Sequence, residues 1–131
     1  MKSSYLCPKC KGHLKVGDSV IFSTKTKNNE VGLILLNTKL GDYKYINHPS
    51  YKFEEGELIE FYCPICHTNL VASDIHNNLA KILTIDEKDN VYEILFSMIA
   101  GEKCTFKMKL SKVEEYGEHT SRYKHYLKFF R

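Results

Sequence analysis

The same short cysteine motif occurs twice in this sequence. Residues 7–14 read CPKCKGHL and residues 63–70 read CPICHTNL, so both follow the pattern C-P-x-C-x-x-x-L. A tight turn after the first cysteine of a C-x-x-C pair lets two thiolates converge on one ion, and the amide hydrogens of that turn can bond to the sulfurs. Two such turns supply four thiolates. The repeat therefore predicts that two distant parts of the chain meet at one metal ion.

The residues around the cysteines fit this interpretation. The proline after the first cysteine presets φ for a turn, and Gly12 in the first copy or Asn69 in the second can adopt a positive φ where the chain leaves the turn. The repeated leucines, Leu14 and Leu70, are expected to pack beneath the two turns.

These two turns resemble the knuckles of a zinc ribbon. The residues that carry the resemblance are Cys7, Pro8, Cys10 and Leu14 with Cys63, Pro64, Cys66 and Leu70. Zinc ribbons join two knuckles on short hairpins around one ion, so the resemblance implies that Cys7, Cys10, Cys63 and Cys66 are the ligands. The spacing differs, because 52 residues separate Cys10 from Cys63, against roughly 15–20 in the common four-cysteine signature. The insertion is expected to hold a hairpin or a small sheet.

The sequence leaves the metal open between zinc and iron, since a tetrahedral site of four sulfurs suits both. Rubredoxins use paired C-x-x-C knuckles for iron, usually with glycine directly after the second cysteine. Lys11 and His67 stand at those places here, which favours zinc and leaves a rubredoxin-like electron carrier as an alternative. Four thiolates leave no open position on zinc, so the ion is predicted to be structural.

The fifth cysteine, Cys104, is expected in the core and not in a reactive site. It shares one face of a predicted strand with Phe106, Met108 and Leu110, and apolar surroundings raise the pKa of a thiol. The first six residues are too few for a signal peptide, and no apolar run approaches the length of about 18 residues that crosses a membrane. A cytoplasmic protein with reduced thiols and no membrane association is therefore expected.

Length and composition predict one compact domain over residues 1–131. Hydrophobic residues make up 43% of the chain and aromatic residues 12%, which is enough for a core and favours sheet structure. The expected fold is mainly β, of α+β type: a zinc ribbon with an antiparallel sheet and one amphipathic helix at the C-terminus. Within it, the knuckles at 7–14 and 63–70 enclose a β-rich insertion at 15–62, and strands and the helix follow over 71–131.

Hydrophobic patterning places the elements. Strands are predicted over 19–24, 31–36, 43–46, 57–62, 81–86, 91–98 and 103–110. Ser111 and Glu114 have the spacing of a capping box, which predicts a helical turn there. The stripe formed by Tyr123, Tyr126, Leu127 and Phe130 predicts the terminal amphipathic helix, which is expected to cover one face of the sheet.

No pattern in the sequence supports an enzyme. None of the common phosphate-binding, dinucleotide, metalloprotease or serine-hydrolase motifs is present. Four glutamates crowd between residues 54 and 60, and the six histidines do not form a ligand set, so both groups are expected to be solvated or structural.

The expected function is that of a small zinc-binding protein that acts as a protein-interaction or adaptor module, with a protein partner or self-association. A nucleic-acid-binding zinc ribbon is the alternative, because basic residues lie among aromatic ones near both ends of the chain. The candidate nucleic-acid contacts are Lys9, Lys11, Lys15, Arg122, Lys124 and Lys128.

Overall fold

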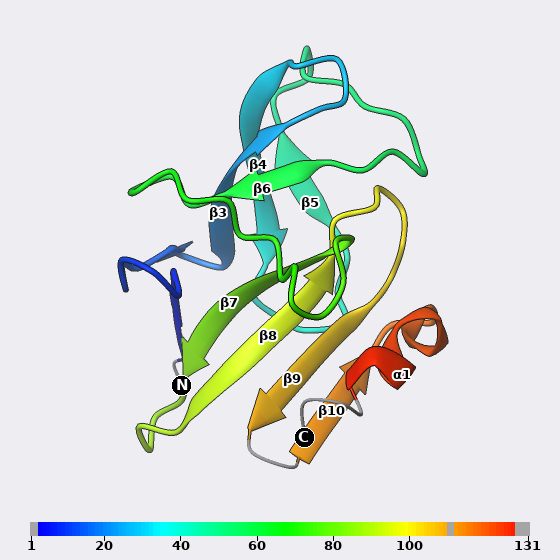
Figure 1. Ribbon diagram of the computed structural model, residues 1–131. Helices are drawn as coiled ribbons and strands as arrows, with labels where there is room; N and C mark the ends of the chain where they lie inside the picture. Colours follow the sequence, from blue (N-terminus) through cyan, green and yellow to red (C-terminus); the bar gives the residue numbers. More distant parts are fainter. Residues whose placement is uncertain (1–2, 110–111, 128–131) are drawn as a thin grey trace.

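Two antiparallel sheets form the protein, as seen in a computed structural model that describes residues 3–109 and 112–127 (Figure 1). The first sheet has the order β1 (Ser4–Leu6), β7 (Leu79–Ile85), β8 (Val91–Ser97), β9 (Thr105–Lys109) and β10 (Lys112–Tyr116). The second sheet has the order β2 (Lys15–Val16), β3 (Ser19–Lys25), β4 (Val31–Asn37) and β5 (Tyr45–Asn47), with β6 (Glu60–Tyr62) also paired to β3. The predicted β-rich fold with antiparallel sheets is confirmed.

The inner faces of the two sheets share one core. Alternate residues of β3 and β4, including Phe22 and Ile34, pack against Ile82 of β7 and Phe96 of β8. The rings of Phe22, Phe61 and Phe96 lie with their centroids 5.3 Å apart in each pair. The aromatic content noted in the sequence therefore fills the space between the sheets.

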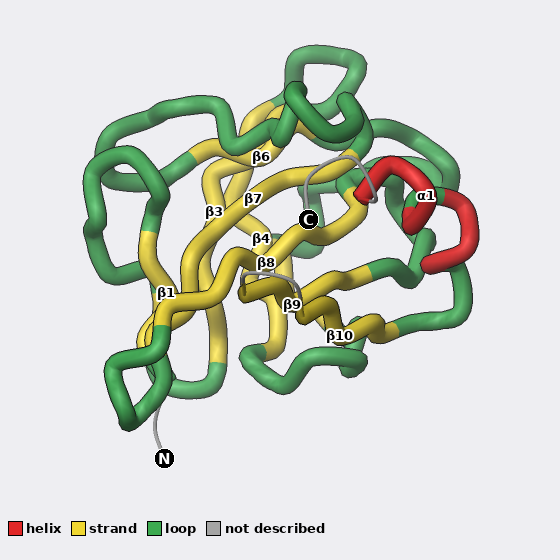
Figure 2. The backbone as a smooth tube through the Cα atoms, turned by 60° about the horizontal axis from the view of Figure 1, so that its bottom comes forward, coloured by secondary structure: helices red, strands yellow, loops and turns green. Residues whose placement is uncertain are grey.

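The C-terminal segment covers the outer face of the first sheet. A 3₁₀-helix, Thr120–Arg122, leads into the short helix α1 (Lys124–Leu127), which lies beside β9 and β10 (Figure 2). Tyr123 and Leu127 pack on Leu95 and Phe106 in a second cluster of buried residues. The expected helix over one sheet face is confirmed for the described residues, and Phe130 of its predicted stripe lies outside them.

Two local predictions were wrong. The segment that contains Glu114 is not a helical turn but part of β10, because Val113 pairs with Met108 of β9 and packs against the second cluster. The positive φ in each knuckle falls one or two residues before the expected position, at Lys11 (62°) and His67 (67°). The Lys11 and His67 amides bond back to the first cysteine carbonyl of their knuckles. In this five-residue turn the residue that donates adopts the left-handed conformation.

The cysteine repeat extends into a duplication of the surrounding structure. In each half a short strand leads into a knuckle, and a hairpin follows: β1 precedes β3–β4, and β6 precedes β7–β8. The two hairpins are related by a shift of 60 positions in residue number, which matches Thr24 with Thr84 and Ile34 with Ile94. Their turns also match, with φ near +64° at Asn29 and +63° at Asp89.

The leading strands are exchanged between the two halves. β1 of the first half pairs with β7 of the second, whereas β6 of the second half pairs with β3 of the first. The registers agree with the duplication, since Leu6 pairs with Leu83 and Tyr62 pairs with Ser23. This exchange brings the two knuckles together, because each begins where its leading strand ends on the opposite sheet.

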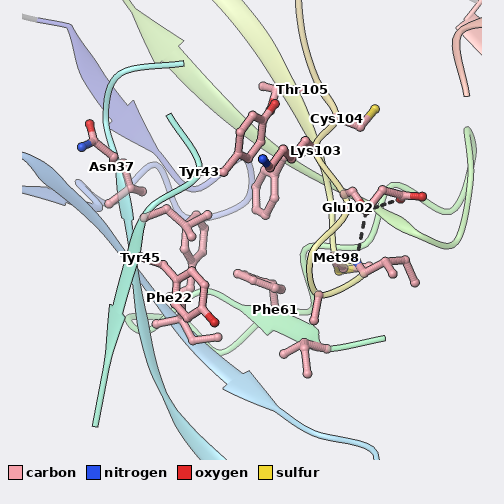
Figure 3. A pocket seen from close by; sticks show the side chains of 18 of the residues that line it. Phe22, Asn37, Tyr43, Tyr45, Phe61, Met98, Glu102, Lys103, Cys104 and Thr105 are labelled. Carbon is pink, nitrogen blue, oxygen red and sulfur yellow. Dashed lines mark hydrogen bonds between the residues drawn. The ribbon is translucent and has the colours of Figure 1, made fainter. Parts of the chain in front are cut away.

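A cavity of about 430 Å³ lies between the two sheets (Figure 3). Its inner wall consists of apolar side chains from both halves, and its mouth lies near the segment that joins β4 to β5.

Among the described residues no helix has the length and apolar character needed to cross a membrane.

Candidate metal centre and adjoining surfaces

The four knuckle cysteines converge on one point. The Sγ atoms of Cys7, Cys10, Cys63 and Cys66 all lie within 4.8 Å of one another. The Sγ atoms are 3.8 Å apart in the pairs Cys7–Cys66 and Cys10–Cys63. A zinc–sulfur bond of about 2.3 Å makes the edge of a regular tetrahedron about 3.8 Å, so a divalent ion fits among these sulfurs. The expected clustering of the four cysteines is confirmed.

Backbone amides surround the sulfurs as they do in metal knuckles. The amides of Lys9 and Cys10 donate to Cys7 Sγ at 3.3 and 3.5 Å, and those of Ile65 and Cys66 donate to Cys63 Sγ at 3.3 and 3.4 Å. Such N–H···S bonds stabilise negative charge on sulfur and hold the ligands in place. The two knuckles therefore present the same ligand geometry from two distant parts of the chain.

Neighbouring groups shift the pKa values of the two buried ligand thiols in opposite directions. Burial acts to raise the pKa of Cys7, but hydrogen bonds from the amides of Cys10 and Lys9 and from the thiols of Cys63 and Cys10 together lower it to about 7. At Cys63 burial dominates and raises the pKa to about 11. A bound divalent cation releases such protons, since thiolates are the metal ligands.

The packing of the knuckles explains the residues between the ligands. Leu14 and Leu70 are 2% exposed and belong to the shared core, as the sequence predicted. Gly12 leaves room for the other knuckle, because a Cβ there would lie 2.5 Å from Cδ1 of Ile65. The two knuckles are thus packed on each other as well as on the core.

Cys104 lies apart from this cluster. It is fully buried beside Phe106 and Leu95. Burial, followed by the charges of Glu102 and Glu115, raises its pKa to about 12. The predicted core position of Cys104 is confirmed.

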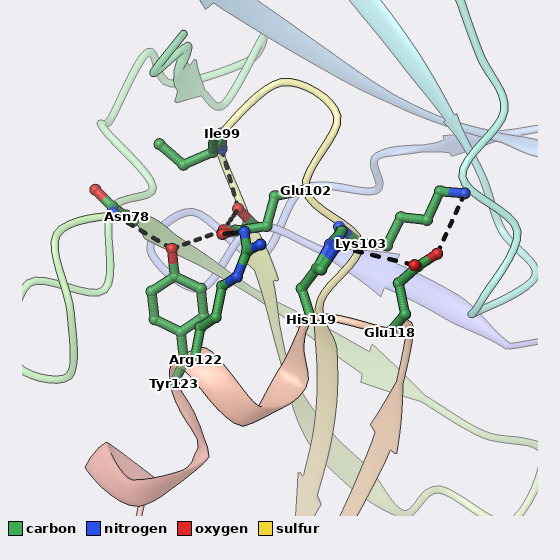
Figure 4. Close-up of polar contacts among 9 residues, drawn as sticks. Asn78, Ile99, Glu102, Lys103, Glu118, His119, Arg122 and Tyr123 are labelled. Carbon is green, nitrogen blue, oxygen red and sulfur yellow. Dashed lines mark hydrogen bonds and ion pairs between the residues drawn. The ribbon is translucent and has the colours of Figure 1, made fainter. Parts of the chain in front are cut away.

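The candidate nucleic-acid contacts come from two segments, the first knuckle and the C-terminal segment. Arg122 donates to the Glu102 carboxylate at 2.7 Å (Figure 4), and Lys124 lies 3.9 Å from Glu115. Near the first knuckle, the ammonium groups of Lys11 and Lys15 donate to backbone carbonyls, and Lys9 is exposed. Lys128 lies outside the described residues.

Glu57 and His76, which belong to the acidic and histidine groups noted in the sequence, have structural partners. The Glu57 carboxylate accepts from the amides of Glu54 and Lys27 at 2.9 and 2.8 Å, and these bonds lower its pKa. His76 packs edge-on against Tyr123 and Tyr126. Within residues 3–109 and 112–127, the only group of metal-ligating side chains found is the one of four cysteines.

An apolar surface on the second sheet was not predicted from the sequence. Alternation along β4 turns Ile34 inward and Leu33 and Leu35 outward. We call this surface the outer apolar face; it consists of Val16, Ile21, Leu33, Leu35 and Ile46. The exposed fractions of Val16, Leu33 and Ile46 are 65%, 53% and 63%. Its sequence signal was a β4 segment with apolar residues at both inward and outward positions.

Comparison with known protein families, with curated proteins and with solved structures gave no match to this chain. The assignment of a metal centre therefore follows from the geometry of the four sulfurs and their amide donors.

Proposed function

We propose that this protein is a small zinc-binding interaction module. Cys7, Cys10, Cys63 and Cys66 hold one structural zinc ion, and the outer apolar face binds an amphipathic helix of a partner protein. Zinc bound by four thiolates has no position for water or substrate, so its role is to fix the fold. The contact with the partner is the function that this fold serves.

The observation that carries the proposal is a difference between the two duplicated halves. The shift of 60 positions matches Ile21 with Lys81 and Leu33 with Glu93. In the second half this outward-facing, half-buried pair is charged, and Lys81 lies 3.7 Å from Glu93. In the first half both positions are apolar, although they face outward. Contiguous apolar surface of this kind on a sheet indicates a binding site for another protein.

The second half also indicates what kind of structure fits such a face. There Leu95, which matches Leu35, is fully buried under Tyr123 and Leu127 of the C-terminal segment. A helical segment with apolar residues four positions apart therefore covers the equivalent surface within the same molecule. A partner helix with a similar apolar stripe is the occupant that the first half is shaped to accept.

The geometry gives less support to nucleic-acid binding and to electron transfer. Nucleic-acid binding needs free basic groups on one surface, whereas Arg122 and Lys124 are engaged with Glu102 and Glu115. Electron transfer needs iron, and Lys11 and His67 stand where rubredoxins usually have glycine.

Metal analysis tests the first part of the proposal. Native mass spectrometry and elemental analysis of the purified protein are expected to give one zinc ion per chain and no visible absorption. One iron ion per chain with visible absorption would contradict zinc and favour an electron carrier.

A double variant that copies two residues of the second half into the first tests the binding of a partner helix to the outer apolar face. The double substitution Ile21→Lys/Leu33→Glu reproduces the Lys81–Glu93 pair on the first half, so it should leave the melting temperature and zinc content unchanged. Amphipathic helical peptides are selected from a displayed library against the natural protein and then titrated into ¹⁵N-labelled protein. Shifts are expected on β3, β4 and β5, and the double variant is expected to bind none of the selected peptides.

Three results would overturn this assignment of the outer apolar face. The selection could yield no peptide, or the shifts could map to the knuckles or to the first sheet. Alternatively, the natural protein could form a dimer whose interface is this face, shown by a mass that falls to the monomer value in the double variant.

A further inference from the structure

The cavity between the sheets is a second site, separate from the metal centre and from the outer apolar face. None of the four knuckle cysteines lines it, and its volume is about 430 Å³. Protein interiors normally contain few voids larger than a water molecule. Pockets for small ligands fall between about 300 and 1,000 Å³. A cavity of this size in so small a core is therefore a candidate ligand site.

The inner part of the cavity is apolar. Phe22, Ile34, Ile82 and Ile94 belong to its wall, and Met98 lies at one side (Figure 3). Among the described residues, no buried side-chain nitrogen or oxygen lacks a hydrogen-bond partner. Water held in a cavity needs two to four polar partners. Such walls suit a hydrocarbon group better than a cluster of ordered water.

The mouth of the cavity is polar and carries charged side chains. Lys39 and Lys103 line it, and a shallow depression that continues outward from it adds Lys44. Among the described residues no acid pairs with Lys39, while Lys103 lies 3.8 Å from an exposed Glu118. Three acids, Asp42, Glu55 and Glu102, also line the cavity. Asp42 accepts from Asn37 and from the Lys44 amide, and Glu55 is exposed beside Gly101. Glu102 is held by Arg122 and Tyr123.

We propose that this cavity binds a small amphipathic carboxylate of the fatty-acid class. Its hydrocarbon chain lies between the sheets, and its carboxylate meets the ammonium groups of Lys39 and Lys103 at the mouth. The tyrosines that flank the opening, Tyr43 and Tyr45, would contact the part of the chain next to the carboxylate (Figure 3). The apolar walls suit the hydrocarbon chain, and the two lysines at the mouth suit the carboxylate.

The test uses the complete zinc-loaded protein and decanoate below its micelle concentration, with decanol as the neutral probe of equal chain length. Calorimetry should show saturable binding of one decanoate per chain, and decanol should bind more weakly. In methyl spectra, Ile34 and Ile94 should shift and Ile46 on the outer apolar face should not. The double substitution Lys39→Met/Lys103→Met should weaken decanoate binding about tenfold, as the loss of charge-assisted hydrogen bonds does. The same change should leave decanol binding unaltered.

Two further variants complete the test. Lys88→Met removes a lysine in an exposed turn away from the cavity and should leave decanoate binding as it is. Leu36→Trp fills the cavity from its wall and should abolish the binding of both probes; because the chain has no tryptophan, the emission of the new side chain shows whether it is buried.

Failure to saturate with decanoate would overturn the proposal. Equal affinity for decanoate and decanol would do so as well, and so would shifts confined to Ile46. None of these results bears on the outer apolar face, whose variants lie on the other side of the sheet.

Discussion

The surroundings of a buried cysteine decide its chemistry in this protein. Cys7 and Cys104 are both fully buried. Cys7 Sγ accepts hydrogen bonds from two backbone amides and lies 3.8 Å from Cys66 Sγ. Cys104 lies among apolar side chains, and burial raises its pKa to about 12. Burial also raises the pKa of Cys63, to about 11, so a position among other sulfurs, and not a low pKa alone, distinguishes a ligand from a core thiol.

This contrast predicts different results for two cysteine variants. Cys63→Ala removes one ligand and is expected to lose the metal ion, as measured by elemental analysis after dialysis, and to lower the melting temperature strongly. Cys104→Ala serves as the matched control: it should keep one ion per chain and lose about 1 kcal/mol of stability, the effect of one buried heavy atom. Loss of metal from Cys104→Ala would show that the fifth cysteine takes part in binding.

A second prediction concerns Glu102, which ties the C-terminal segment to the first sheet (Figure 4). Its carboxylate accepts from Ser97, Tyr123 and Arg122 at 2.5, 2.6 and 2.7 Å. Burial acts to raise the pKa of Glu102, but these three bonds lower it below its usual value of 4.5. The ionised form therefore stabilises the fold above pH 4.5, and this contribution is lost as the pH falls through the lowered pKa.

Glu102→Gln is accordingly expected to lower the free energy of unfolding at pH 7 by about 1–3 kcal/mol, since it removes bonds to a buried charged group. It should also flatten the decline of stability below pH 4.5. Thermal melts between pH 3 and pH 7 measure both effects, with Glu30→Gln, an exposed glutamate, as the control. An unchanged acid decline in Glu102→Gln would assign the pH dependence to other carboxylates.

At the scale of elements, the hairpin of β3 and β4 depends on a glycine. A Cβ at Gly32 would lie 2.8 Å from the ring of Tyr51, which packs across this strand. The Tyr51 hydroxyl in turn lies 2.7 Å from Thr24 Oγ1. The glycine is thus required for the close approach of an aromatic ring and not for a turn.

We therefore expect Gly32→Ala to displace Tyr51 and to destabilise the protein by about 1–3 kcal/mol, the usual cost of overpacking. Leu33→Ala on the adjacent outward position is the control and should change stability by less than about 0.5 kcal/mol. Chemical denaturation measures both changes. An equal loss in the two variants would contradict the role given to Gly32.

Elements with a clear alternation or an internal repeat were predictable from the sequence. The strands β3, β4, β7 and β8 were found within about two residues, and the repeated cysteines identified the metal cluster. The predicted helical turn at Glu114 was wrong, because pairing with β9 outweighs a local capping signal. The exchange of β1 and β6 could not be predicted, since no local pattern specifies which distant strand a short segment joins.

The outer apolar face shows a further limit of the sequence. The residues of β4 read as a fully buried strand, and the sequence does not say that its outward side chains, such as Leu33, lack a cover. The duplication supplies the information that the outward side chains of β4 lack a cover. Once β3–β4 is aligned with β7–β8, the replacement of Lys81 and Glu93 by Ile21 and Leu33 stands out at positions that face solvent in both hairpins.

At the scale of the whole molecule, the exchanged strands mean that the metal centre links the two sheets. β1 pairs with β7 and ends directly before Cys7, while β6 pairs with β3 and ends directly before Cys63. Release of the ion frees both knuckles at once, so the strand before each of them loses its anchor. The two sheets should therefore lose stability together and not one after the other.

Chelation tests this coupling. We expect a strong chelator to lower the melting temperature in a single transition, because a structural metal ion in a small domain contributes on the order of 10 kcal/mol to folding. Hydrogen exchange should accelerate in both hairpins, at Phe22 and Ile34 of the first half as well as at Ile82 and Ile94 of the second. The variant Cys63→Ser, which lacks a ligand from the outset, should show the same exchange pattern with and without chelator. If β7 and β8 stayed protected while β3 and β4 exchanged, the ion would support only the first half, and the strand exchange would not couple the two sheets.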